Sequence, residues 1–199
     1  MARQELQGAG EGWREGGFTL LEMLAALAIV ALLVLVAAPS WSAWQQRRQL
    51  QAEAEALLGS LALARAQALM QQQRVTLCPS RTGAVCETTG LGLSEGAQAV
   101  GWELGWIVFV DRNRNGLREA EEPLLQQRPA SPRGVHISSR STLGQSMAYG
   151  ADGGSEGVRG QFLAGTLEVC GAGQAEGWQL VLNPLGRARL AKAEVGTCP

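Results

Sequence analysis

Apolar residues form one nearly continuous run close to the start of the chain. From Phe18 to Pro39 almost every position is apolar or small, and Glu22 is the only charged one. A helix that crosses a bilayer needs about 20 such residues, so this run is long enough to do so. A single carboxylate inside such a run is costly and by default marks function, which makes Glu22 a candidate functional residue.

The pattern then changes to a helical period. Beyond the run, apolar residues recur at i, i+4, i+7 and i+11, a spacing that predicts a helix with one apolar face. We therefore expect one helix over about 18–72, bent near Pro39, whose second half packs its apolar face against a sheet. That face consists of Leu50, Ala54, Leu57, Leu61, Ala64 and Ala68.

The rest of the chain alternates in the manner of short strands separated by turns. We expect mainly antiparallel pairing in one sheet, with irregular glycine-rich segments at 87–101 and 144–160. The fold class is then α+β, with a long N-terminal helix packed on an antiparallel sheet. The predicted strands are 74–78, 105–110, 123–125, 135–137, 161–163, 166–170, 178–182 and 187–191.

Charge and cysteine content narrow the possible partners and compartments. The net charge is −1, so only a local basic patch would attract nucleic acid. Four cysteines follow the apolar run, which favours disulfides in an oxidising compartment. Pairing Cys78 with Cys86 and Cys170 with Cys198 requires the simplest topology, and the two other connectivities remain open.

The inventory of reactive groups argues against an enzyme. His136 is the only histidine, and a cysteine nucleophile would need a base partner. No nucleophile–base pair and no phosphate-binding glycine loop is recognisable. We therefore expect no catalytic residues and, with one exception, no cofactor.

The exception is a calcium-like loop over residues 111–122. Its pattern D-x-N-x-N-G-x5-E supplies oxygen ligands and a glycine at the positions that a calcium loop uses. The flanking segments are a strand and Pro123 rather than two helices, so a β-hairpin with Asn115-Gly116 at its tip is the alternative interpretation. The two interpretations are compatible, and the predicted calcium ligands are Asp111, Asn113, Asn115 and Glu122.

The start of the apolar run resembles a known processing motif. Gly17-Phe18-Thr19-Leu20-Leu21-Glu22 is similar to the motif of type IV pilins and pseudopilins, in which a prepilin peptidase cuts after the glycine and methylates the new amino terminus. The resemblance implies a cut between Gly17 and Phe18. It also implies that Glu22 pairs with the amino group of a neighbouring subunit in a filament. A secretory signal peptide, with Val36-Ala37-Ala38 as its cleavage site, and a simple anchor are the rival interpretations.

The same resemblance predicts three parts of the chain and their location. Residues 1–17 would be a cleaved cytoplasmic leader, 18–45 a transmembrane and filament-core helix, and 46–199 a soluble head domain. The precursor would lie in the inner membrane as a single-pass protein with its head in the periplasm, and would enter a pilus or pseudopilus after assembly with other pilins.

Two further segments are similar to the GspH/FimT family of minor pilins. They are the strand 105–110 running into 111–116, and the end 183–189. FimT-like members that serve natural transformation bind DNA through a C-terminal Gly-Arg-x-Arg, which residues 186–189 match. Carried over, Arg187 and Arg189 would contact DNA from one face of a strand, with Lys192 extending the patch. The alternative is that the two arginines are exposed to solvent on one face of the sheet and bind no ligand.

The resemblance therefore implies a type IV pilin-like fold and one of two functions. The first is a FimT-like minor type IV pilin that takes part in pilus assembly and binds DNA for uptake. The second is a GspH-like minor pseudopilin of a type II secretion system. The processing motif is common to both and does not separate them.

Overall fold

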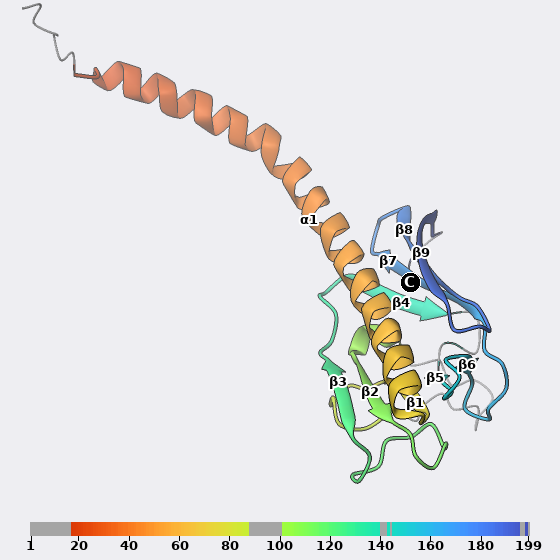
Figure 1. The fold of residues 1–199 in the computed structure, drawn as a ribbon. Helices are drawn as coiled ribbons and strands as arrows, with labels where there is room; N and C mark the ends of the chain where they lie inside the picture. The colour runs from red at the N-terminus through yellow and green to blue at the C-terminus, as the bar shows by residue number, and fades with distance from the viewer. Residues whose placement is uncertain (1–16, 88–100, 140–142, 144, 196–197, 199) are drawn as a thin grey trace, which may run out of the picture. The chain divides into compact units, whose positions relative to one another are not determined.

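The computed structural model describes residues 17–87, 101–139, 143, 145–195 and 198. Except for Gly17, the predicted leader lies outside these residues. The chain forms two compact units, Met1–Ala43 and Trp44–Pro199. Helix α1, Leu20–Gln71, begins in the first unit and ends in the second (Figure 1), which confirms the single long helix that the sequence predicts.

The strands of the second unit form two antiparallel sheets rather than the single sheet that we expected. The first has the order β3-β2-β1-β5-β6 and the second the order β4-β7-β8-β9. A short 3-10 helix, Trp102–Leu104, precedes β2. The strands are β1 Val75–Pro79, β2 Trp106–Val110, β3 Leu124–Arg128, β4 Val135–Ser139, β5 Met147–Tyr149, β6 Ser155–Glu156, β7 Gly165–Gly171, β8 Glu176–Leu182 and β9 Ala188–Glu194.

The glycine-rich segment 144–160 was wrongly expected to be a loop. It contains β5 and β6, and β5 pairs with β1 through Thr76 and Ala148. Strands of two or three residues are too short to show alternation, so their pairing depends on contacts distant in sequence. The strand predicted at 161–163 is reduced to a single bridge between Glu156 and Phe162.

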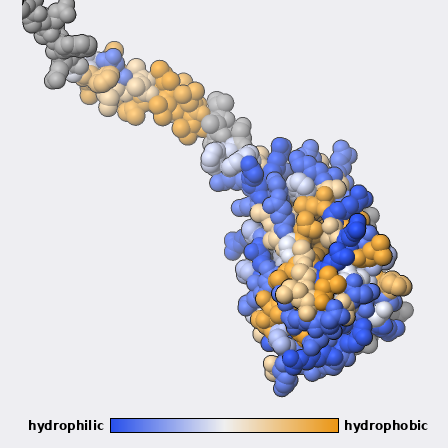
Figure 2. All heavy atoms as spheres, viewed as in Figure 1, coloured by the Kyte–Doolittle hydropathy of each residue, from blue (hydrophilic) through white to orange (hydrophobic). Residues whose placement is uncertain are grey.

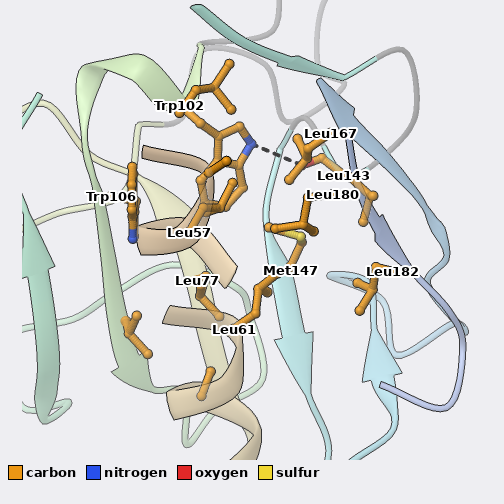
Figure 3. Close-up of a cluster of buried hydrophobic side chains, with 14 of the residues drawn as sticks. Leu57, Leu61, Leu77, Trp102, Trp106, Leu143, Met147, Leu167, Leu180 and Leu182 are labelled. Carbon is orange, nitrogen blue, oxygen red and sulfur yellow. Dashed lines mark hydrogen bonds between the residues drawn. The ribbon is translucent and has the colours of Figure 1, made fainter. Parts of the chain in front are cut away.

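The core of the second unit lies between the predicted apolar face of α1 and the two sheets. All six residues of that face are at most 3% exposed. In Figure 3, Leu57 and Leu61 lie between Trp106 on one side and Met147 and Leu180 on the other. Burying one leucine side chain contributes about 1.5–3 kcal/mol, so this face fixes the helix to the sheets.

The polar atoms of the two buried tryptophans find partners in the core. The Trp102 indole N–H donates to the carbonyl of Leu143 at 3.1 Å, and the Trp106 indole N–H donates to the Ser60 hydroxyl at 2.9 Å. Because a buried donor without a partner costs about 1–3 kcal/mol, these bonds allow the large rings to stay inside.

Both disulfides join the cysteines that the sequence favours. Cys78 pairs with Cys86, with 5.5 Å between their Cα atoms, and closes the turn after β1. Cys170 of β7 pairs with Cys198, with a Cα separation of 5.8 Å. The second disulfide ties a residue near the C-terminus to the second sheet.

Candidate functional site

The predicted processing site lies immediately before helix α1. Gly17 to Thr19 precede the helix, and the side-chain oxygen of Thr19 accepts the backbone N–H of Glu22 at 3.3 Å. This is an N-cap, in which a side chain satisfies a backbone donor that has no partner within the helix. Glu22 is exposed and lies in the first turn, where the helix dipole favours a negative charge.

The Thr19 cap is a feature that our sequence interpretation missed. The spacing Thr19-x-x-Glu22 has the form of a capping box, S/T-x-x-E, and would have predicted where the helix starts. The cap fixes the first turn, and the junction Gly17–Phe18 therefore remains outside the helix.

The helical segment that follows exposes its apolar side chains on all sides. Between residues 18 and 35 every large apolar side chain is between 53% and 81% exposed. Figure 2 shows the apolar colour over this segment. Among the described residues, no helix combines the length and apolarity required to cross a membrane.

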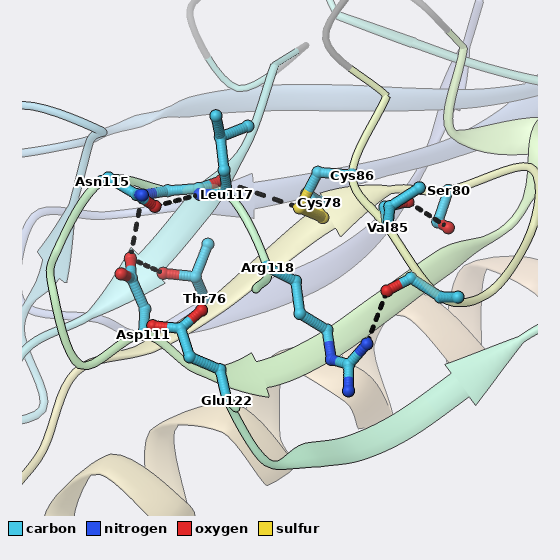
Figure 4. Close-up of a disulfide and its surroundings, with 12 residues drawn as sticks. Thr76, Cys78, Ser80, Val85, Cys86, Asp111, Asn115, Leu117, Arg118 and Glu122 are labelled. Carbon is cyan, nitrogen blue, oxygen red and sulfur yellow. Dashed lines mark hydrogen bonds between the residues drawn. A yellow bond between two sulfur atoms is a disulfide. The ribbon is translucent and has the colours of Figure 1, made fainter. Parts of the chain in front are cut away.

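Most of the calcium-like oxygens of the loop 111–122 accept bonds within the protein (Figure 4), while Asp111 Oδ1 is buried without a hydrogen-bond partner among the described residues. Asp111 is fully buried, and one of its carboxylate oxygens accepts the Thr76 hydroxyl at 2.8 Å and the Gly116 N–H at 3.1 Å. The two carboxylate oxygens of Glu122 accept the N–H groups of Arg112 and Glu119 at 2.8 and 3.1 Å. The carboxylates therefore fix the loop's backbone.

The two asparagines of the loop form turns instead of converging on one point. The Asn113 side-chain oxygen accepts the Asn115 N–H at 3.1 Å, and that of Asn115 accepts the Leu117 N–H at 2.7 Å. Within the described residues, no group of three or more His, Cys, Asp or Glu side chains is arranged to hold a metal ion. This geometry favours the hairpin interpretation of the loop.

A buried arginine supplies positive charge beside the loop. The Arg74 Nε lies 3.1 Å from Asp111 Oδ2, the same oxygen that accepts the Thr76 hydroxyl and the Gly116 N–H. The Arg74 Nη1 lies 3.6 Å from a carboxylate oxygen of Glu156. Its Nη2 also donates to the Gly157 carbonyl at 2.9 Å. Burial lowers the pKa of Arg74, while the Asp111 and Glu156 carboxylates act in the opposite direction. Our sequence interpretation missed this network because Glu156 is 82 positions away in the chain.

Arg187 and Arg189 lie at one edge of the second sheet. Arg187 follows the turn between β8 and β9, and its N–H donates to the Asn183 side chain at 2.8 Å. Arg189 lies opposite Val181 on the edge strand β9. Both arginine side chains are exposed, so the predicted basic pair is accessible.

Lys192 does not extend this pair, contrary to the sequence interpretation. It lies opposite Trp178, with its ammonium 5.7 Å from the centre of the indole ring. Ala188 and Leu190, which pack on the core, lie on the same face of β9 as Lys192. Alternate residues of a strand point to opposite faces. The odd spacing between Arg189 and Lys192 therefore separates them.

Comparison with known proteins identifies the family. The profile of the family described as Type II transport protein GspH matches residues 53–186, and that of the Prokaryotic N-terminal methylation motif matches residues 14–38. The first match covers more than half of the chain. The chain therefore belongs to the GspH family, within the minor pilins and pseudopilins that carry an N-methylation motif, as its resemblance implied.

Solved structures of similar fold include a minor pilin and a minor pseudopilin. The type IV minor pilin FimU of Pseudomonas aeruginosa superposes with a TM-score of 0.53 and 18% identity, over 74% of this chain and 92% of that one. The minor pseudopilin EpsH of the Vibrio cholerae type 2 secretion system gives a TM-score of 0.46 and 12% identity, over 72% of this chain and 96% of that one. No curated protein sequence matches closely enough to count as a relative. The superposition on FimU shows that the fold is type IV pilin-like.

Proposed function

We propose that this chain is a FimT-like minor type IV pilin. In its precursor form the apolar segment lies in the inner membrane, with the head in the periplasm. A prepilin peptidase cuts after Gly17 and methylates Phe18, and the product assembles with other pilins. The observation that carries this proposal is a helical segment that starts at the methylation motif and exposes apolar side chains on all sides. Such a surface needs lipid or other apolar helices around it.

The position of Glu22 supports the assembly step. Its carboxylate is exposed in the first turn of α1, and burial in a bundle of apolar helices would require a positive partner. The cut after Gly17 creates such a partner, because the new amino group of Phe18 on a neighbouring subunit is positively charged.

Processing is tested by expressing the full chain with a prepilin peptidase and measuring the mass of its N-terminus. We expect a product that begins at N-methylated Phe18, and we expect Gly17→Val to block its formation. The matched control Gly16→Val changes the adjacent glycine and should still be cut. A wild-type chain that keeps its first 17 residues, or is cut after Ala38, would refute the proposal.

Assembly is tested separately with Glu22→Ala. We expect this variant to be processed but to be absent from filaments sheared from the cells. Glu55→Ala is the matched control, since Glu55 is an exposed glutamate of the same helix and should enter filaments normally. Equal incorporation of both variants would remove the role proposed for Glu22.

The alternative function is that of a GspH-like minor pseudopilin, and the name of the matching family supports it. Deleting the gene in the native host distinguishes the two. Loss of surface pili with normal exoprotein secretion favours the pilus, and the reverse result favours the secretion system.

DNA binding is a second candidate function, supported by the exposure of both Arg187 and Arg189. Arginine contacts to phosphate oxygens are independent of sequence and sensitive to salt. Two contacts in one subunit give weak binding, and several copies in a filament would increase it through avidity.

The DNA test is a gel shift of duplex DNA by the full chain in non-ionic detergent. We expect log K of the wild type to fall with log salt with a slope of about −1.8, since each of the two phosphate contacts contributes about 0.9. We expect the double variant R187A/R189A to lose the shift. R112A/R159A removes two other exposed arginines and should keep the shift. A wild-type chain that does not shift DNA at low salt would end this candidate function.

A further inference from the structure

The second unit contains an open pocket with basic and aromatic walls, about 340 Å³ in volume. The early part of α1 in this unit contributes Trp44, Arg47 and Arg48, and the hairpin of β8 and β9 contributes Glu176, Trp178 and Lys192. This volume lies within the range of small-molecule sites, about 300–1,000 Å³. Neither the processing motif nor the Arg187–Arg189 pair takes part in it.

Two of the pocket's cations lie over aromatic rings. The Arg48 guanidinium carbon is 5.4 Å from the centre of the Trp44 ring, and the Lys192 ammonium is 5.7 Å from that of Trp178. Contacts of this kind hold a cation over the ring face. They orient both charges at the pocket walls while leaving their hydrogen-bond donors available to a ligand.

The charge of the pocket favours an anion. Within the described part of the chain, none of Arg47, Arg48 and Lys192 forms a salt bridge with a carboxylate. Glu176 is the one acidic residue among the lining residues, so three positive charges face one negative charge. Guanidinium groups present paired donors that match phosphate oxygens, and the indole rings offer an apolar surface beside them.

The position of the pocket residues in the sequence indicates which phosphate-containing ligand the pocket binds. Trp44 follows Pro39, where the apolar run ends, by only five residues. Tryptophan and basic residues beside an apolar segment are typical of the zone of lipid headgroups. An open pocket of this small volume, with basic and aromatic walls, suits one headgroup and its glycerol better than a duplex, which is bound along an extended surface.

We propose that this pocket binds the headgroup of an anionic phospholipid. The inference rests on the proposed membrane-held state of the precursor. Arg47, Arg48 and Lys192 contact the phosphate, and Trp44 and Trp178 contact the glycerol and the upper acyl chains. The site holds the base of the head domain at the membrane surface before the subunit leaves the bilayer.

Native mass spectrometry of the full chain in non-ionic detergent tests the proposal. With mixed phosphatidylglycerol and phosphatidylcholine, we expect the wild type to retain phosphatidylglycerol with a preference of at least about tenfold. We expect the triple variant R47Q/R48Q/K192Q to lose this preference. The matched control R112Q/R133Q/R159Q makes the same charge change at exposed positions outside the pocket and should retain the preference.

A second variant keeps the test independent of any damage caused by the triple substitution. Glu176→Gln removes the pocket's carboxylate, and we expect it to increase phosphatidylglycerol retention. Thermal melting of every variant checks the fold. Absence of a wild-type preference, or equal loss in the pocket and control triples, overturns the proposal.

Competition identifies the source of the phosphate. We expect millimolar glycerol 3-phosphate and inorganic phosphate to leave phosphatidylglycerol bound, and displacement by either would make the pocket a site for free phosphate instead. Displacement of phosphatidylglycerol from the wild type by duplex DNA would make the pocket a DNA site and overturn the proposal. Cleavage after Gly17 is measured on the same chains. Failure of the proposed function then appears as missing cleavage, and failure of this inference as missing lipid preference.

Discussion

Helix α1 contains two apolar segments that differ in burial. Residues 50–68 present one apolar face, which the sheets of the second unit bury almost completely. Residues 20–35 are apolar on all sides and stay exposed within the single chain. A helix with one apolar face can bury that face against the rest of its own domain. A helix that is apolar on all sides is typically buried in a large core or in a membrane. The second unit therefore has a core of its own, whereas the apolar side chains of residues 20–35 are left uncovered by the described part of the chain.

The largest expected effect comes from truncating the same residue type in each segment. Leu57→Ala leaves a cavity at a fully buried position and should lower the free energy of unfolding by about 2–5 kcal/mol. Leu27→Ala alters a side chain that is 61% exposed and should change the free energy of unfolding by less than about 0.5 kcal/mol. Urea denaturation of the full chain in non-ionic detergent measures both. A comparable loss in the two variants would show that the first segment packs against the chain after all.

A second comparison uses the carboxylates of the two units. Asp111→Asn removes one charge of a fully buried ion pair with Arg74 and should cost about 3 kcal/mol of unfolding free energy, because the Arg74 charge loses its nearest partner. Glu22→Gln, at an exposed carboxylate, should lower the unfolding free energy by less than about 1 kcal/mol, the contribution of a charge at a helix N-terminus. Denaturant unfolding reports both values, and Asp152→Asn serves as an exposed control within the second unit. An Asp111→Asn variant as stable as the wild type would mean that Arg74 does not depend on this carboxylate.

The sequence predicts the parts of this protein that have a strong local pattern. The apolar face of α1 is correct residue by residue, because its period depends only on the helix. The two-residue strand β6 and the division into two sheets were missed, since they depend on pairing between distant segments. The partners of Arg74 were missed for the same reason. Lys192 was wrongly assigned to the face of Arg187 and Arg189, although the alternation of side chains along β9 places it on the opposite face.

Alkaline pH should lower the free energy of unfolding of the second unit through Tyr149, the chain's only tyrosine. Burial raises the pKa of Tyr149 to about 12, although the nearby Arg65 opposes this change. The folded state thus holds the phenol proton more tightly than the unfolded state, in which the pKa is about 10. The resulting stability is complete below pH of about 10 and is lost as the pH rises toward about 12.

The corresponding loss is at most about 2.7 kcal/mol, since each pKa unit corresponds to about 1.36 kcal/mol. Tyr149→Phe should remove this component and flatten the alkaline stability profile relative to the wild type. Phenolate absorbance of the native chain measures the titration of Tyr149 directly. A midpoint near pH 10 in the folded protein would contradict the burial argument.

The smallest expected effect concerns the calcium-like loop, and it tests whether the second unit is complete without an added ion. Arg74 already lies beside the Asp111 carboxylate, and both oxygens of Glu122 accept backbone N–H groups. A calcium ion would have to displace these bonds and approach an existing positive charge. An ion that binds only the folded state would raise the melting temperature. We therefore expect adding calcium, or removing it with a chelator, to shift the melting temperature by less than about 1 °C. A rise with calcium that disappears in Glu122→Gln would restore the calcium interpretation. It would also make the stability of the second unit dependent on a bound ion.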